Sequence, residues 1–131
     1  MIVVDASAVI ELLLHTEIGK SVARRIADSA VSLHAPHLLD LEVAQVLRRL
    51  EAGGVVGGGR TTRALEVFGQ LDIARWAHDA LLPRICALRA NLTAYDAAYV
   101  SLAEALPATV LTCDAKLADA SLHTARVEVV T

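Results

Sequence analysis

Residues 2–14 of the chain read IVVDASAVIELLL, and this stretch decides the fold class. The β-branched run Ile2–Val4 predicts a short buried strand, because such residues pack well on a pleated surface. Asp5 interrupts the apolar run, and the stretch from Ala8 to Leu14 then favours a helix. The sequence therefore predicts a first unit made of a strand, an acidic turn and a helix.

The same alternation continues along the chain. Further strands are expected at residues 31–35, 71–76, 109–111 and 126–130, and further helices at residues 17–29, 40–51, 61–70, 78–90, 93–105 and 114–120. Strands that alternate with helices predict a parallel sheet with helices on both faces, because parallel neighbours need a long crossover connection. We therefore expect an α/β fold.

The helix expected at residues 40–51 carries one of the acids considered below. Its buried face is expected to comprise Leu41, Ala44, Val46 and Leu47. Gly53 and Gly54 should end this helix. The glycine-rich stretch 53–59 lacks the Lys-Ser/Thr ending and the preceding strand of a phosphate-binding loop, so we interpret it as a flexible loop between two helices.

The size and composition of the chain set further limits. Its 131 residues fit a single domain spanning residues 1–131. No basic segment precedes the first apolar run and Glu11 interrupts the next one, so we expect neither a signal peptide nor a membrane anchor, and a cytoplasmic location. Cys86 and Cys113 lack partners at metal-ligand spacing, so neither a zinc site nor a disulfide framework is expected.

The charge of the chain bears on whether it binds nucleic acid. A formal net charge of −3 argues against it at first, since phosphate contacts require Lys and Arg. If four acids belong to a metal site, however, the other residues carry a net charge of +1. Six arginines could then contact RNA, namely Arg24, Arg25, Arg48, Arg49, Arg60 and Arg63. Solvated helix faces explain these arginines equally well.

The apolar content of the chain is high. Hydrophobic residues make up 55% of it, and the mean hydropathy is +0.50. This is more apolar surface than one small core hides, so we expect an interface with a second subunit or with a partner protein.

Four acids are expected at one edge of the sheet. Asp5 follows the first strand, and Asp114 follows the run Val110–Cys113. In open parallel sheets, sites lie at the carboxyl ends of the strands, near the point where the strand order reverses. Glu42 and Asp96 lie near the starts of two expected helices that would face the same edge. Four carboxylates in one cleft repel each other, and divalent cations usually compensate for this.

Each acid also has a purely structural interpretation. Asp5 and Asp114 are suitable helix N-caps. Asp96 fits a capping box with Thr93, three residues earlier. Glu42 is a first-turn acid that interacts favourably with the helix dipole. Taken one at a time, these interpretations remain open.

The local sequence around the four acids resembles a known family. The segments concerned are residues 2–8 (IVVDASA), 41–43 (LEV), 92–103 (LTAYDAAYVSLA) and 111–118 (LTCDAKLA). In this order they resemble the motifs of PIN-domain ribonucleases, and the third closely resembles that of VapC-type toxins. The resemblance covers essentially the whole chain and implies a three-layer α/β/α fold with a five-stranded parallel sheet.

The resemblance also implies a function, namely hydrolytic cleavage of RNA by an endoribonuclease. It implies Mg²⁺ as the cofactor, with Mn²⁺ as a substitute, a homodimer, and a co-expressed VapB-like antitoxin whose C-terminal segment fills the active groove of a larger toxin–antitoxin assembly. Asp5, Asp96 and Asp114 would hold one or two cations. Glu42 would bind a cation directly or orient the attacking water.

Three more polar residues lie close to these acids in the sequence. Ser7 and Thr112 are candidates for hydrogen bonds to the carboxylates, although simple capping or core-edge hydroxyls fit equally well. Lys116 would either reach a phosphate or balance the acidic edge.

Two other classes of α/β protein fit the sequence less well, and a third interpretation stays open. A phosphoacceptor receiver domain needs paired acids after the first strand and another after the third, whereas Ala6 follows Asp5 and the strand expected at residues 71–76 ends without an acid. A haloacid-dehalogenase-like phosphatase would need Asp in place of Ser7. A non-catalytic interaction module stays open, because a fold does not dictate a function.

Overall fold

The computed structural model describes residues 1–118 and 123–131. The strands in these residues are β1 (Ile2–Val4), β2 (Leu33–Pro36), β3 (Ile73–Trp76), β4 (Thr109–Thr112) and β5 (Arg126–Val129). The helices are α1 (Ala6–Leu13), α2 (Glu17–Ile26), α3 (Leu38–Ala52), α4 (Gly58–Gln70), α5 (Leu82–Ala87) and α6 (Ala94–Ala105). Two short 3₁₀ turns are η1 (Asp79–Leu81) and η2 (Ala115–Leu117).

The strands form one parallel sheet in the order β3-β2-β1-β4-β5. The expected α/β class with a five-stranded parallel sheet is therefore confirmed. The chain adds β2 and β3 on one side of β1 and then adds β4 and β5 on the other, so the strand order reverses between β1 and β4. Val4 pairs with Leu111, which brings the residues after β1 and β4 to the same edge.

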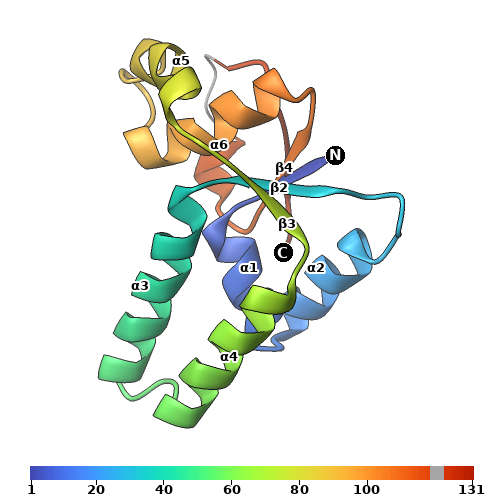
Figure 1. Ribbon diagram of the computed structural model, residues 1–131, viewed down its shortest axis with the longest axis vertical. Coiled ribbons are helices and arrows are strands. Elements are labelled where there is room, and N and C mark those ends of the chain that lie inside the picture. Colours follow the sequence, from blue (N-terminus) through green and yellow to red (C-terminus); the bar gives the residue numbers. More distant parts are fainter. Residues whose placement is uncertain (119–122) are drawn as a thin grey trace.

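Helices cover both faces of the sheet (Figure 1). Helices α5 and α6 lie on one face, and α1 and α2 lie on the other. Helices α3 and α4 form a hairpin that projects away from the sheet on the side of α1 (Figure 1). This arrangement has the three layers expected from the sequence.

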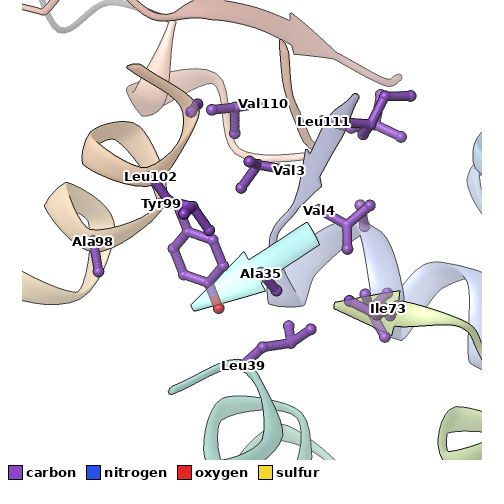
Figure 2. Close-up of a cluster of buried hydrophobic side chains, with 14 of the residues drawn as sticks. Val3, Val4, Ala35, Leu39, Ile73, Ala98, Tyr99, Leu102, Val110 and Leu111 are labelled. Carbon is purple, nitrogen blue, oxygen red and sulfur yellow. The ribbon is translucent and has the colours of Figure 1, made fainter. Parts of the chain in front are cut away.

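The hydrophobic core lies on both sides of the central strands (Figure 2). Val3 and Val110 point toward Leu102 of α6, whereas Val4 and Leu111 point to the opposite face. All five residues are buried. Burial on both faces explains why β1 (IVV) and the centre of β4 (Val110 and Leu111) carry consecutive apolar residues rather than alternating ones.

Side chains at the helix starts fix where two of the helices begin. The carboxylate of Asp5 accepts a hydrogen bond from the N–H of Ala8 (3.1 Å) at the start of α1. The hydroxyl of Thr93 accepts one from the N–H of Asp96 (3.1 Å) at the start of α6. Each bond satisfies a backbone donor that has no partner within its helix. The predicted N-cap role of Asp5 and of Thr93 is therefore confirmed.

The buried face predicted for α3 is partly wrong. The helix begins at Leu38, two residues earlier than expected, and its fully buried residues are Leu39, Val43 and Leu47. These residues recur every four positions, which is the spacing of one helix face. The prediction began the helix after Leu39 and so assigned Leu41 and Ala44 to the core, whereas Leu41 is 77% exposed and Ala44 is also exposed.

The remaining differences concern helix lengths. The helix expected at residues 78–90 is a 3₁₀ turn followed by the short α5, and Pro83 lies in the first turn of α5, where proline is tolerated. Helix α4 begins at Gly58, so only part of the glycine-rich stretch is a loop. The helix expected at residues 114–120 is the turn η2, and residues 119 and 120 lie outside the described residues. None of the described helices combines the length and apolar character needed to cross a membrane.

Candidate active site

The carboxyl ends of β1 and β4 carry two of the four acids. Asp5 is the residue that follows β1, and Asp114 lies two residues beyond the end of β4. Because these strands are neighbours where the strand order reverses, both acids lie at the switch point of the sheet. They occupy the edge at which the sequence predicted them.

Asp5 is held by donors on both carboxylate oxygens. Ser7 Oγ donates to Oδ1 (2.7 Å), as does the N–H of Ala8 (3.1 Å), and Thr112 Oγ1 donates to Oδ2. Asp5 is 6% exposed. Burial raises the pKa of Asp5, against the opposing effect of the hydrogen bonds from Thr112 and Ser7. Asp5 is therefore a carboxylate of fixed orientation whose charge costs free energy.

The hydroxyls of Ser7 and Thr112 also join the two strand ends to each other. The N–H of Cys113 donates to Ser7 Oγ (2.9 Å), and the N–H of Asp114 donates to Thr112 Oγ1 (2.9 Å). The two hydroxyl oxygens lie 3.3 Å apart. Both residues thus contact the Asp5 carboxylate, which is one of the two interpretations that the sequence left open.

Asp114 caps the turn η2 and also faces the acidic edge. Its Oδ1 accepts a hydrogen bond from the N–H of Lys116 (3.0 Å). Its negative charge raises the pKa of Asp96, and the positive charge of Lys116 lowers it, each less strongly than burial acts on that group. Lys116 therefore partly balances the acidic edge.

Glu42 of α3 is held from the core by a residue of α6. Tyr99 Oη donates to Glu42 Oε1 at 2.6 Å. Tyr99 is 2% exposed, and Figure 2 shows its ring beside the sheet with its oxygen pointing away from α6. Burial raises the pKa of Glu42, while the hydrogen bond from Tyr99 lowers it. The hydrogen bond fixes Oε1 of Glu42, whereas Oε2 does not contact the Tyr99 hydroxyl.

Sequence reasoning did not identify Tyr99 as a residue of the site. Its signal was its spacing from Asp96, because residues three positions apart in a helix lie on the same face. Both residues lie in α6, whose first turn contains Asp96. A buried tyrosine usually finds a partner for its hydroxyl, so an acid on a facing helix was a reasonable candidate.

The four acids meet in one cleft of about 440 Å³. We call it the acidic cleft, and its lining includes a fifth acid, Glu11, beside Asp5, Ser7, Glu42, Arg49, Asp96, Tyr99 and Asp114. Burial is the largest cause of the raised pKa of Asp5, Glu42 and Asp96, and the charges of neighbouring cleft acids raise each pKa further. The cleft therefore concentrates negative charge that a cation would neutralise.

The acids do not form a tight cage. Within the part of the chain that the structure describes, no three His, Cys, Asp or Glu side chains are grouped closely enough to hold a metal ion between them. Ser7, Thr112 and Tyr99 donate to three of the four carboxylate oxygens of Asp5 and Glu42, which fixes the orientation of both acids. The structure thus brings the four acids to one cleft and keeps them apart within it.

Cys113 is not a nucleophile of this site. Burial and the negative charge of Asp5 raise the pKa of its thiol to about 11, so the thiol is protonated at neutral pH. The thiolate is the reactive form of cysteine, so the protonated thiol of Cys113 is a weak nucleophile.

The fold and the acidic cleft together define a family. The family model of the PIN domain matches residues 2–122, and the chain belongs to this family. Ribonuclease VapC9 of Mycobacterium tuberculosis is 45% identical over 119 residues, which cover 91% of this chain and 90% of that protein. Ribonuclease VapC12 of the same species is 38% identical over 130 residues, or 99% of each chain. Within the PIN domains, the chain therefore belongs with the VapC ribonucleases.

A solved structure supports the fold independently. VapC20 of Mycobacterium tuberculosis, a sarcin-ricin loop cleaving toxin, superposes with a TM-score of 0.71 over 92% of this chain and 95% of that chain. The two sequences are only 12% identical. At this distance the likeness concerns the fold, which agrees with the three-layer architecture described above.

Proposed function

We propose that this protein is a divalent-metal-dependent endoribonuclease and acts as the toxin of a VapBC-type toxin–antitoxin pair. The observation that carries the proposal is the acidic cleft, where acids from four separate segments meet beside the switch point of the sheet. The VapC relatives, which match this chain over most of its length, are named ribonucleases. The receiver-domain alternative loses its support because the chain belongs to the PIN family.

The donor set of the cleft fits Mg²⁺, with Mn²⁺ as a substitute. The four acids offer only carboxylate oxygens, which hard cations of this kind prefer. Mg²⁺ usually keeps several waters and binds through one or two carboxylates, so it does not require a preformed cage. When bound, such an ion lowers the pKa of water and neutralises negative charge on the phosphate.

Four of the cleft acids have a proposed role. Asp5, Asp96 and Asp114 are the proposed cation ligands. Glu42 either joins them or uses its free Oε2 to orient the attacking water, while Tyr99 holds Oε1. The hydrogen bonds to Asp5 from Ser7 and Thr112 fix that carboxylate before a ligand arrives, which lowers the cost of reorganisation.

The proposal is tested by RNA cleavage with and without a chelator. Purified protein is incubated with single-stranded and total RNA in Mg²⁺, then in excess EDTA, and again after Mg²⁺ is restored. We expect cleavage in Mg²⁺, its loss in EDTA and its recovery. Cleavage that persists in EDTA would contradict the metal requirement, and a wild-type protein that cleaves no RNA would favour a non-catalytic interaction module.

A matched pair of variants shows whether the activity belongs to the acidic cleft. Asp114→Asn removes a cleft acid, whereas Asp72→Asn removes an exposed acid outside the cleft lining. We expect Asp114→Asn to lose cleavage and Asp72→Asn to keep it. Equal activity of the two variants would assign the cleavage to another site or to a contaminant.

We also propose that the protein, a single domain, forms a homodimer. Large apolar side chains exposed in the single chain include Leu65, Trp76 and Leu82. Such residues favour a subunit interface when they gather in one patch. Analytical ultracentrifugation at micromolar concentration should give the mass of a dimer, and a strictly monomeric species would contradict this assignment.

The proposed antitoxin is a small VapB-like protein encoded by a neighbouring gene. Its C-terminal segment would occupy the active groove and suppress cleavage, within a larger assembly of both proteins. Co-expression should relieve the growth arrest caused by this protein alone. Harmless overexpression of this protein without any partner would argue against a toxin.

A further inference from the structure

A second, mostly apolar groove of about 280 Å³ adjoins the acidic cleft. It lies between α3 and the first turn of α6, and its lining includes Leu38, Leu41 and Tyr95. We call it the side groove. It shares Glu42, Val46 and Arg49 with the lining of the acidic cleft, so the two hollows are continuous.

Two apolar side chains that line the side groove are unusually exposed. Leu41 is 77% exposed and Tyr95 is 66% exposed. The chain has only two tyrosines, one tryptophan and one phenylalanine, so an exposed aromatic ring beside a cleft acid is a notable use of a scarce residue type. Exposed apolar surface next to a site is typical of a ligand-binding groove.

Arg49 lies where the side groove meets the acidic cleft. It is exposed, and it forms no ion pair within residues 1–118 and 123–131. Its neighbour Arg48 differs, because its Nε donates to Gln45 Oε1 at 3.1 Å and it lines neither hollow. An arginine with five free donors at this junction is suited to a phosphate oxygen.

We propose that the side groove is a nucleotide subsite, in which Tyr95 and Leu41 hold an unpaired nucleobase and Arg49 binds the phosphate beside it. The assignment deepens the proposed function, on which it rests. Every base has a flat π-face, and aromatic stacking on single-stranded nucleic acid tolerates different sequences. Protein recognition of RNA sequence also takes place mainly where bases are unstacked and accessible.

The dimensions and charges of the groove favour a nucleotide over a bulkier ligand. Its 280 Å³ is just below the roughly 300–1,000 Å³ typical of sites for drug-sized ligands, which suits a single base. RNA with one phosphate among the four acids must continue out of the cleft, and Arg49 lies on α3 about 10 Å beyond Glu42. The side groove thus offers a cation and an aromatic ring to the nucleotide next to the scissile bond.

The consequence for activity is selectivity for unpaired RNA. A base that must enter the side groove cannot remain stacked and paired in a duplex. Loss of the ring should weaken RNA binding by about 5- to 150-fold, which corresponds to the stacking free energy per base. Loss of the Arg49 charge should weaken binding whether or not a base is present.

Binding assays separate these contributions. The probes are a fluorescently labelled, unstructured RNA of about a dozen nucleotides and the abasic ribose-phosphate oligomer of the same length. Anisotropy is measured in Mg²⁺, with Asp96→Asn in every protein so that the RNA stays intact. Added changes are Tyr95→Ala, Tyr95→Phe, Arg49→Gln and, as a matched control, Arg48→Gln.

We expect the contribution of the nucleobases to binding to depend on the aromatic ring at position 95. With Tyr95 or Phe at position 95, the RNA should bind more tightly than the abasic oligomer, and Tyr95→Ala should remove most of this difference. Arg49→Gln should weaken both probes by a similar factor, and Arg48→Gln should change little. Melting temperatures of all variants show whether each remains folded.

Two results would overturn the subsite. One is an RNA preference in Tyr95→Ala as large as in its parent, and the other is equal losses in Arg49→Gln and Arg48→Gln. Either would exclude a nucleotide as the occupant of the side groove. Failure of the proposed function is distinguishable, because it appears as absent cleavage by the wild-type protein in Mg²⁺, which the binding comparison does not require.

Discussion

The two ends of α6 hold carboxylates in opposite surroundings. Asp96 lies in the first turn, in the acidic cleft, with Asp114 raising its pKa. Glu104 lies near the other end, where Arg84 donates to both of its oxygens at 2.7 and 3.0 Å and the N–H of Thr124 donates to one of them at 3.0 Å. The hydrogen bonds from Arg84 lower the pKa of Glu104.

The two ends differ in whether the charge of the carboxylate is compensated within the fold. Glu104 has its cation built into the fold, so its charge is already compensated. Among the described residues, no Lys or Arg forms an ion pair with any of the four cleft acids. Neutral hydroxyls orient Asp5 and Glu42 without neutralising them. The cleft therefore retains a demand for a cation from solution, which is what a metal-dependent site requires.

The largest expected effect comes from Asp96→Asn, which removes the charge and keeps the shape. RNA cleavage should fall by orders of magnitude, because cation binding supplies most of the chemistry. The metal-free variant should melt no lower than metal-free wild type, since the change relieves repulsion among the acids. Added Mg²⁺ should raise the melting temperature of wild type more than that of the variant.

A purely structural role of Asp96 at the start of α6 predicts a different result. If Asp96 served only the helix start, its replacement would lower stability by up to about 1 kcal/mol and leave cleavage intact. A metal-free variant that melts lower and still cleaves at nearly the wild-type rate would remove Asp96 from the proposed site.

A smaller effect is expected from Tyr99→Phe, which deletes only the hydroxyl that holds Glu42. Loss of a hydrogen bond to a ligating or water-orienting carboxylate should reduce cleavage or Mg²⁺ affinity by about 10- to 100-fold. The stability cost should be about 1 kcal/mol, because the ring stays in the core. Mg²⁺ titrations followed by cleavage rate and by melting temperature measure both effects. Unchanged Mg²⁺ dependence would make the bond to Glu42 merely structural.

The smallest effect on activity is expected from Glu104→Gln, at the compensated end of α6. Cleavage should be unchanged, while the melting temperature at neutral pH should fall by a few degrees. Glu104 has a pKa below its ordinary 4.5, so its stabilisation is complete above pH 4.5 and is lost as the pH falls through its folded-state pKa. The deficit of the variant should therefore shrink in acid.

The metal-free Asp96→Asn variant should show the opposite sign in the same pH series. Because the pKa of Asp96 is raised above 3.8, the cost of its charge is absent below pH 3.8, grows as the pH rises toward the folded-state pKa, and is complete above it. Any advantage of the variant should therefore be greatest near neutral pH. Melting temperatures of both variants and of wild type are measured from pH 3 to 7. If both variants differed from wild type with the same sign, the proposed contrast between Asp96 and Glu104 would be wrong.

Local patterns in the sequence predicted the parts of the site that depend on neighbouring residues. The strand before Asp5, its cap on α1 and the helix start at Thr93 all follow from short-range patterns. The family resemblance put the four acids in order along the chain. Their shared cleft follows from parallel strands that end at one edge.

Local sequence patterns could not predict contacts between segments that are distant in the chain. The bond from Tyr99 to Glu42 joins residues 57 positions apart, and it depends on how α3 packs against α6. The exposure of Leu41 was missed because the helix phase depended on Leu39, which lies before the predicted start. Ser7 and Thr112 were expected near the acids, but only the structure selects the carboxylate of Asp5 as their partner.

The bond between Asp5 and Thr112 joins the two ends of the chain, which bears on when the proposed site can form during synthesis. The two residues are 107 positions apart, and Asp114 comes later still. Because a ribosome releases the amino-terminal part of a chain first, β1 emerges long before β4 can pair with it. If the cleft acids carry cleavage as proposed, a nascent chain that ends before residue 114 lacks an acid of the site. A cell translating this message would then meet an active nuclease only after β4 has been made and has left the ribosome.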